Sequence, residues 1–174
     1  MRERPQQGYN VLMSEVEIRQ VLREDAGWKK AFEDFYSACG VRRVGRRRHA
    51  YFAAWAGAEL AGHSVVLFDK GRWVMDGLLV KPEFREKGIA KKLTEARIRY
   101  AVGQGAAEIW YACEDGNLVT TCCHLRYGFE KVCPAHHHCS IATAHWYRLK
   151  VTPALFRKFP ALRPGEGMNA YSAV

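Results

Sequence analysis

Apolar residues follow two periods along the chain, and the changes between them mark the predicted elements. Short apolar and β-branched runs predict strands over residues 9–13, 50–55, 60–68, 73–80, 108–113, 129–132 and 141–151. Apolar residues spaced by three and four predict helices, over residues 28–36 and from residue 89 to 100. A Ser-x-x-Glu pattern, Ser14 to Glu17, predicts a further helix start, and Asn117 opens another helix. These elements form one continuous fold.

The helix that begins at Ile89 is clearly amphipathic. One face carries Ile89, Leu93, Ala96 and Tyr100. The rest of the helix surface is expected to carry the charged residues Lys91, Lys92, Glu95, Arg97 and Arg99. The predicted strand 73–80 precedes this helix and ends at Pro82, which cannot donate a ladder hydrogen bond.

The loop 85–90 joins that strand to the helix and is suited to hold a pyrophosphate. Gly88 and the small Ala90 let the backbone approach a ligand closely. The first N–H groups of a helix have no partner within the helix, so an anion there gains hydrogen bonds and dipole attraction. Three basic residues surround the same place: Arg85, Lys87 and Lys91. A diphosphate is the predicted ligand, although a simple tight turn before a surface helix has a similar composition.

The loop belongs to a longer pattern, Leu78-x-Val80-x-Pro82-x-x-Arg85-x-x-Gly88-x-Ala90-x-x-Leu93. This pattern resembles the acetyl-coenzyme A motif of the GNAT N-acetyltransferase superfamily, in which strand, loop and helix stand in this order. A second segment, from Asn117 to Gly128-Phe129, resembles the other signature of that superfamily, an asparagine opening a helix that ends in Gly-Phe. Together the two signatures cover residues 78–129.

The resemblance implies a fold and an activity. The expected fold is α/β, of the α+β kind, with a mixed, mostly antiparallel central sheet of six to seven strands flanked by about four helices. It spans residues 1–151, and residues 152–174 are expected as a C-terminal extension. The expected donor is acetyl-coenzyme A or another acyl-CoA. The expected reaction is direct transfer of the acyl group to a primary amine of a small molecule or peptide.

The resemblance also implies which residues hold the donor. The pantetheine arm is expected in a gap between strands 73–80 and 108–113, held by backbone groups of Leu78, Leu79 and Val80. Around the pyrophosphate, the implied cofactor-binding residues are Arg85, Glu86, Lys87, Gly88, Ile89, Ala90 and Lys91. Asn117 is expected to contact the arm.

Two side chains are candidates for proton transfer. Many members of the superfamily carry a tyrosine four residues before the Gly-Phe pair, which protonates the leaving thiolate, and His124 stands there in this chain. An imidazolium can donate to a thiolate, so His124 is either the acid, a residue of a variant active site or a packing residue. Asp76 lies close to where many members place an acidic residue and is the expected general base, acting through water; Glu59 is the second choice. The alternative for both is a solvent-facing strand or turn residue.

The formal net charge of +9 has two possible roles. Part of the excess complements the phosphates of coenzyme A. A separate cluster, Arg42, Arg43, Arg46, Arg47 and Arg48, lies far from the cofactor motif. This cluster either recruits nucleic acid, an aminoacyl-tRNA or an acidic acceptor, or is a solvated loop. A third function, a non-catalytic coenzyme A-binding module, stays open because the tyrosine is missing.

The remaining composition fits one domain of 174 residues. No apolar stretch follows the charges at the N-terminus, so a cytoplasmic location without membrane association is expected. Cysteine thiols stay reduced in that compartment, and four of them are expected as small buried residues: Cys39, Cys113, Cys122 and Cys123.

The segment Cys133 to Cys139 contains two thiols and three imidazoles. Its spacing is not one of the recurring zinc patterns, so no metal is expected, and the alternative is a loop with exposed histidines. Neither the acceptor nor the oligomeric state can be deduced from a motif in this chain.

Overall fold

One sheet of seven strands forms the centre of the molecule in the computed structural model, which describes residues 16–21, 30, 34–35, 49–135 and 143–160. The strands are β1 Val16–Val21, β2 His49–Ala56, β3 Glu59–Asp69, β4 Arg72–Val80, β5 Glu108–Glu114, β6 Glu130–Pro134 and β7 Ala144–Lys150. Their spatial order is β1-β2-β3-β4-β5-β7-β6. All neighbouring pairs are antiparallel except β4 and β5, which are parallel. The expected mixed, mostly antiparallel sheet is confirmed.

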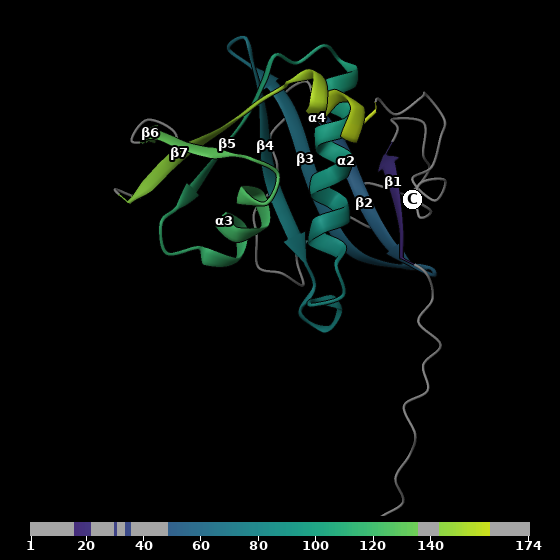
Figure 1. The fold of residues 1–174 in the computed structure, drawn as a ribbon. Helices are drawn as coiled ribbons and strands as arrows, with labels where there is room; N and C mark the ends of the chain where they lie inside the picture. The colour runs from purple at the N-terminus through teal and green to yellow at the C-terminus, as the bar shows by residue number, and fades with distance from the viewer. Residues whose placement is uncertain (1–15, 22–29, 31–33, 36–48, 136–142, 161–174) are drawn as a thin grey trace, which may run out of the picture.

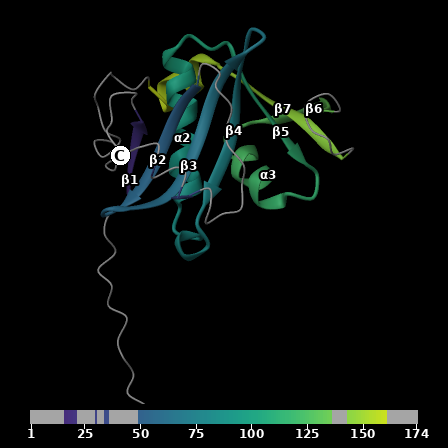
Figure 2. The same ribbon diagram turned by 180° about the vertical axis from the view of Figure 1, so that it is seen from behind.

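Three α-helices accompany the sheet in the described part of the chain: α2 Ile89–Gly103, α3 Leu118–Leu125 and α4 Pro153–Lys158. A short 3-10 turn, η1 Pro82–Phe84, follows β4. Helix α2 runs across one face of the sheet in Figure 1 and packs on β1 to β4, while Figure 2 shows the sheet from the opposite side. In both views β4 and β5 diverge, and α3 lies beside their diverging ends.

The main core lies between α2 and the sheet. Ile89 and Leu93, on the apolar stripe of α2, are almost fully buried. The helix reaches the sheet closely because β3 carries Gly62 below it, where an added Cβ would lie 3.1 Å from Ile89 Cγ2 and 3.2 Å from Leu93 Cδ1. A glycine in the strand therefore sets the distance between β3 and the first turns of α2.

The first strand lies where a helix was predicted to begin. Val16 and Glu17, at the end of the Ser-x-x-Glu pattern, belong to β1 and pair with β2. Ile18 is 2% exposed and joins the core, so burial of this residue against its neighbours decides for a strand. The helix prediction at this position is wrong. The strand predicted over residues 9–13 and most of the helix predicted over 28–36 lie outside the described residues.

The chain beyond β7 packs on the domain as far as the structure describes it. Thr152 caps α4 by accepting a hydrogen bond from Leu155 N at 3.2 Å. Leu155 and Phe159 are buried in the main core, and Phe159 lies edge-on to Tyr127. Residues 153–160 therefore contribute to the core. None of the helices among the described residues has the length and apolar character that crossing a bilayer requires.

Candidate active site

The parallel strands β4 and β5 pair only at their beginnings. Two register pairs connect them, Trp73 with Ile109 and Val74 with Trp110. Both strands continue beyond this point, β4 to Val80 and β5 to Glu114. From Met75 onward, the edge of β4 that faces β5 has no strand partner among the described residues. Its backbone donors and acceptors can therefore pair with an extended ligand.

A β-bulge lies where this free edge begins. Val65 pairs with Asp76 and His63 pairs with Leu79, so two residues of β4 face one residue of β3. Gly77 takes the extra position with φ +56°, and its N–H donates to Asp76 Oδ1 at 2.7 Å. The bulge places the exposed carboxylate of Asp76 beside the start of the divergence. A carboxylate at this place can accept a proton through water. The second-choice base, Glu59, instead forms an ion pair with Lys81 at 2.8 Å.

The loop after β4 has a fixed and unusual backbone. Glu86 has φ +62° and Gly88 has φ +75°, both in the left-handed region, which is rare for a residue such as Glu86. The side chain of Arg85 folds back and its Nε donates to Val80 O at 3.2 Å. Lys87 Nζ donates to Glu83 O at 3.0 Å. Both cations are therefore held close to the turn.

This loop presents a row of free hydrogen-bond donors. The first hydrogen bond of α2 runs from Lys92 N to Gly88 O at 3.1 Å. The backbone N–H groups of residues 86–91 have no acceptor in the described part of the chain. Six consecutive donors, at the positive end of a helix and beside basic side chains, match the acceptor oxygens of a diphosphate.

Asn117 stands at the start of α3, as the sequence indicates. Its Oδ1 accepts a hydrogen bond from Thr120 N at 3.1 Å and caps the helix. Because the side-chain amide group is a separate donor, capping leaves it available for a ligand.

His124 lies inside the domain rather than at its surface. It is 2% exposed, stacks on Tyr111 with 4.1 Å between ring centroids, and lies edge-on to Phe129. Its Nδ1 lies 2.7 Å from Thr120 O, and because a carbonyl only accepts, Nδ1 carries the proton of the neutral ring. Nε2 is buried and has no partner among the described residues. Burial, and then the charge of Arg97, lowers the pKa of His124 to about 3.

A neutral His124 has no proton to give from Nε2. At neutral pH the imidazolium required of a general acid is therefore absent, and among the three alternatives the geometry favours packing. The rings of Tyr111 and Phe129 both pack against the His124 ring.

Arg97 and Arg99 differ from the sequence expectation, which placed them on the helix surface. Arg97 is 1% exposed, and Arg99 is buried beside Phe159 with Nη1 donating to Pro160 O at 3.4 Å. The four-residue spacing from Ile89 through Leu93 to Arg97 puts this arginine on the buried face. The position of Arg97 on the buried face was therefore predictable from this spacing.

Comparison with known proteins agrees with this geometry. The profile of the Acetyltransferase (GNAT) family matches residues 15–129, about two thirds of the chain. The chain belongs to this family. A search of the curated proteins finds no match.

Solved structures show the same GNAT fold at low sequence identity. The ribosomal-protein-S18-alanine N-acetyltransferase from Escherichia coli has 13% identity and a TM-score of 0.63, over 79% of this chain and 95% of that one. A Bacillus subtilis acetyltransferase in complex with CoA has 18% identity and a TM-score of 0.57, over 79% and 100%. A GNAT family acetyltransferase from Elizabethkingia anophelis with acetyl-CoA bound has 11% identity and a TM-score of 0.56, over 78% and 98%.

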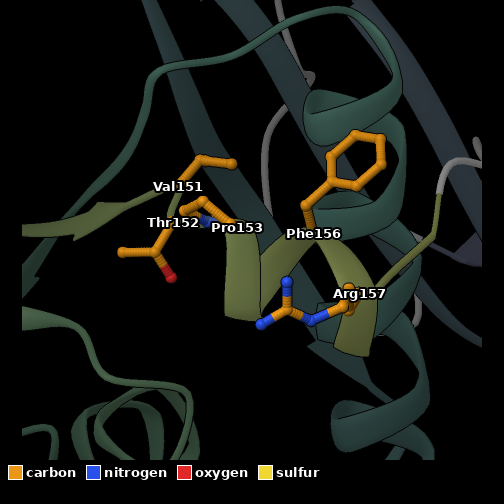
Figure 3. A pocket seen from close by; sticks show the side chains of 5 residues that line it. All are labelled: Val151, Thr152, Pro153, Phe156 and Arg157. Atoms are coloured by element: carbon orange, nitrogen blue, oxygen red, sulfur yellow. The ribbon is translucent and has the colours of Figure 1, made fainter.

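A shallow pocket of this GNAT domain lies away from the diverging strands. It has a volume of about 430 Å³ and forms where β7 runs into α4 (Figure 3). Its lining residues are Val151, Thr152, Pro153, Phe156 and Arg157. None of them belongs to the loop after β4 or to α3, so the pocket is separate from the candidate site.

The cysteines of the GNAT domain differ in their surroundings. Cys113 is buried, as expected, but Cys122 is exposed and Cys123 is half-buried, because α3 turns mainly His124 toward the core. In the described residues, no group of three or more His, Cys, Asp or Glu side chains could hold a metal ion. Cys39, the arginine cluster 42–48 and most of the segment 133–139 lie outside the described residues.

Proposed function

We propose that this GNAT domain transfers an acetyl or other acyl group from acyl-CoA directly to a primary amine of a small molecule or peptide. The row of free N–H groups at residues 86–91, directly after the unpaired edge of β4, carries the proposal. A diphosphate fits the row of N–H groups, and an extended amide-containing arm joined to it fits the unpaired edge of β4. The CoA and acetyl-CoA complexes of the Bacillus subtilis and Elizabethkingia anophelis proteins support the choice of ligand.

In this proposal, the donor lies along the edge of β4. Backbone groups of Leu78, Leu79 and Val80 hold the pantetheine arm in strand-like pairing. The pyrophosphate lies on the N–H groups from Glu86 to Lys91, with Arg85 and Lys87 supplying charge, and Gly88, Ile89 and Ala90 keeping the approach open. The amide of Asn117 contacts the arm from the other side of the divergence.

The domain would then mainly position the two reactants. A neutral amine attacks the thioester carbonyl, and Asp76 takes the amine proton through water because its carboxylate is exposed beside the bulge. We assign His124 to packing of α3 on β5. A second candidate function is a coenzyme A-binding module without catalysis, which the buried and neutral His124 favours.

A thiol-release assay with acetyl-CoA over a panel of amines, peptides and charged tRNA tests the proposal. We expect release that depends on an amine, a fall in kcat for Asp76→Asn, and little change in KM for acetyl-CoA. Glu130→Gln, an exposed carboxylate on β6, is the matched control. Binding of CoA without release for any acceptor would favour the non-catalytic module, and no binding of CoA at all would refute both.

A further inference from the structure

Arg97 is a buried cation whose hydrogen bonds, within the described part of the chain, all go to neutral groups. Its Nε lies 3.4 Å from Leu93 O, its Nη1 lies 3.4 Å from Asp76 O, and its Nη2 lies 3.1 Å from Thr94 Oγ1. No carboxylate among the described residues forms an ion pair with it. A buried charge is normally paired with an opposite charge, because desolvation is otherwise uncompensated. Among the residues that the structure describes, the charge of Arg97 therefore has no ion-pair partner.

The guanidinium keeps its charge in this position. Burial lowers the pKa of Arg97 to about 10, which leaves the group protonated at neutral pH. The nearby groups Cys123, Asp76 and Tyr127 act in the opposite direction and raise its pKa. The interior of the domain thus holds a permanent positive charge.

The charge lies where β4 and β5 begin to diverge. Asp76 O, which accepts from Arg97, is two residues beyond Val74, the last residue of β4 that pairs with β5. Burial lowers the pKa of His124 on α3 and of His63 on β3, and the charge of Arg97 lowers both further. Its field therefore covers the beginning of the divergence, where the proposed function puts the thioester end of the donor.

We propose that Arg97 stabilises the thiolate that leaves during acyl transfer. The inference rests on the proposed function. The amine nitrogen bonds to the thioester carbon, the carbon–sulfur bond breaks, and its electron pair stays on sulfur while the amine proton passes to water and Asp76. The negative charge of the thiolate then lies in the field of Arg97. This electrostatic role does not require a proton from His124.

Binding of CoA and of desulfo-CoA, which lacks the sulfur, tests this role between pH 6 and pH 9. An opposite charge nearby lowers the pKa of an acid by one unit or more. We expect the ratio of CoA affinity to desulfo-CoA affinity to rise with pH by about tenfold or more in the wild type. The ratio should stay flat in Arg97→Met, and Arg97→Gln is a second neutral variant in case the first does not fold.

Other titratable groups near the guanidinium are controlled in the same experiment. His63 and His124 both have a pKa of about 3, and burial raises the pKa of Tyr127 well above its usual range, so none of the three changes charge between pH 6 and pH 9. Cys123→Ser and Asp76→Asn remove the other two groups, and Thr94→Val disturbs the contact without removing the charge. All three should keep the rise.

The outcomes separate the two proposals. A flat ratio in the wild type, or an equal rise in the neutral Arg97 variants, overturns the role of Arg97. Failure of both ligands to bind at every pH instead refutes the proposed function.

Discussion

Gly88 offers a direct test of the donor cradle, because its role can be separated from its contribution to stability. An added Cβ at Gly88 meets no atom within 4 Å, but the residue has φ +75°, which an alanine adopts at a cost of roughly 1–2 kcal/mol. For a chain of this length, that cost corresponds to a fall in Tm of about 2–8 °C. Gly57, in the turn between β2 and β3, has φ +62° and equally open surroundings. Gly57→Ala is therefore a control with the same backbone strain.

The two variants should differ only in binding. Gly88→Ala shifts the N–H groups on either side of residue 88 and places a methyl group in the space of the ligand. Loss of one charge-assisted hydrogen bond costs about 1.5–3 kcal/mol, so CoA affinity should fall by about ten- to a hundredfold. Calorimetry with CoA and thermal unfolding by circular dichroism measure the two effects. Unchanged CoA affinity in Gly88→Ala, or an equal loss in Gly57→Ala, would refute the cradle.

Three further predictions follow from single contacts. Gly62→Ala places a Cβ 3.1 Å from both Leu79 O and Ile89 Cγ2, so denaturant unfolding should show that the free energy of unfolding falls by about 1–3 kcal/mol. The control is Gly116→Ala, whose added Cβ meets no atom within 4 Å and should leave the free energy of unfolding unchanged. Asn117→Asp keeps the cap but removes the amide donor, so its Tm should match that of the wild type while its CoA affinity falls. Asn117→Ala should lower both Tm and CoA affinity, with about 0.5–2 kcal/mol of stability lost. Equal CoA affinity in Asn117→Asp and the wild type would exclude the ligand contact. Unfolded histidine binds a proton near pH 6.5, but the folded pKa of His124 is about 3, so this residue should reduce the free energy of unfolding by about 2 kcal/mol from pH 7 to pH 5. Urea unfolding of His124→Phe should therefore show a smaller loss of stability on acidification. An unchanged pH dependence in this variant would show that His124 is not held neutral.

Local sequence determined the elements around the donor site. Strand β4, the loop and helix α2 follow from a β-branched run, a proline, Gly88 and a helical stripe that starts at Ile89. Asn117 as the start of α3 follows in the same way, because capping involves residues only three positions apart. The order of the elements from β2 to β7 and the mostly antiparallel sheet were also predictable from the pattern and from the resemblance it carries.

Tertiary packing decided the features that involve distant residues. Strand β7 lies between β5 and β6, so the two last strands appear in the sheet in reverse order. Pairing between β4 and β5 ends after Val74 and Trp110. The resemblance implied a gap between these strands, but no local pattern indicates where the gap begins. Val16 and Glu17 form a strand rather than a helix because β2 offers them a partner.

The same reason accounts for the burial of two polar side chains. Arg97 and His124 are polar, and polar residues are usually expected at the surface or at a reacting centre. The spacing from Ile89 indicates the helix face of Arg97, but not what packs against that face. In the fold, α2 and α3 meet the sheet on the faces that carry these residues, and both are buried. Sequence determines which chemical groups are available and which local turns they stand on. Only the packing of elements far apart in the chain decides which groups lose their water, and therefore which charge and protonation state they hold.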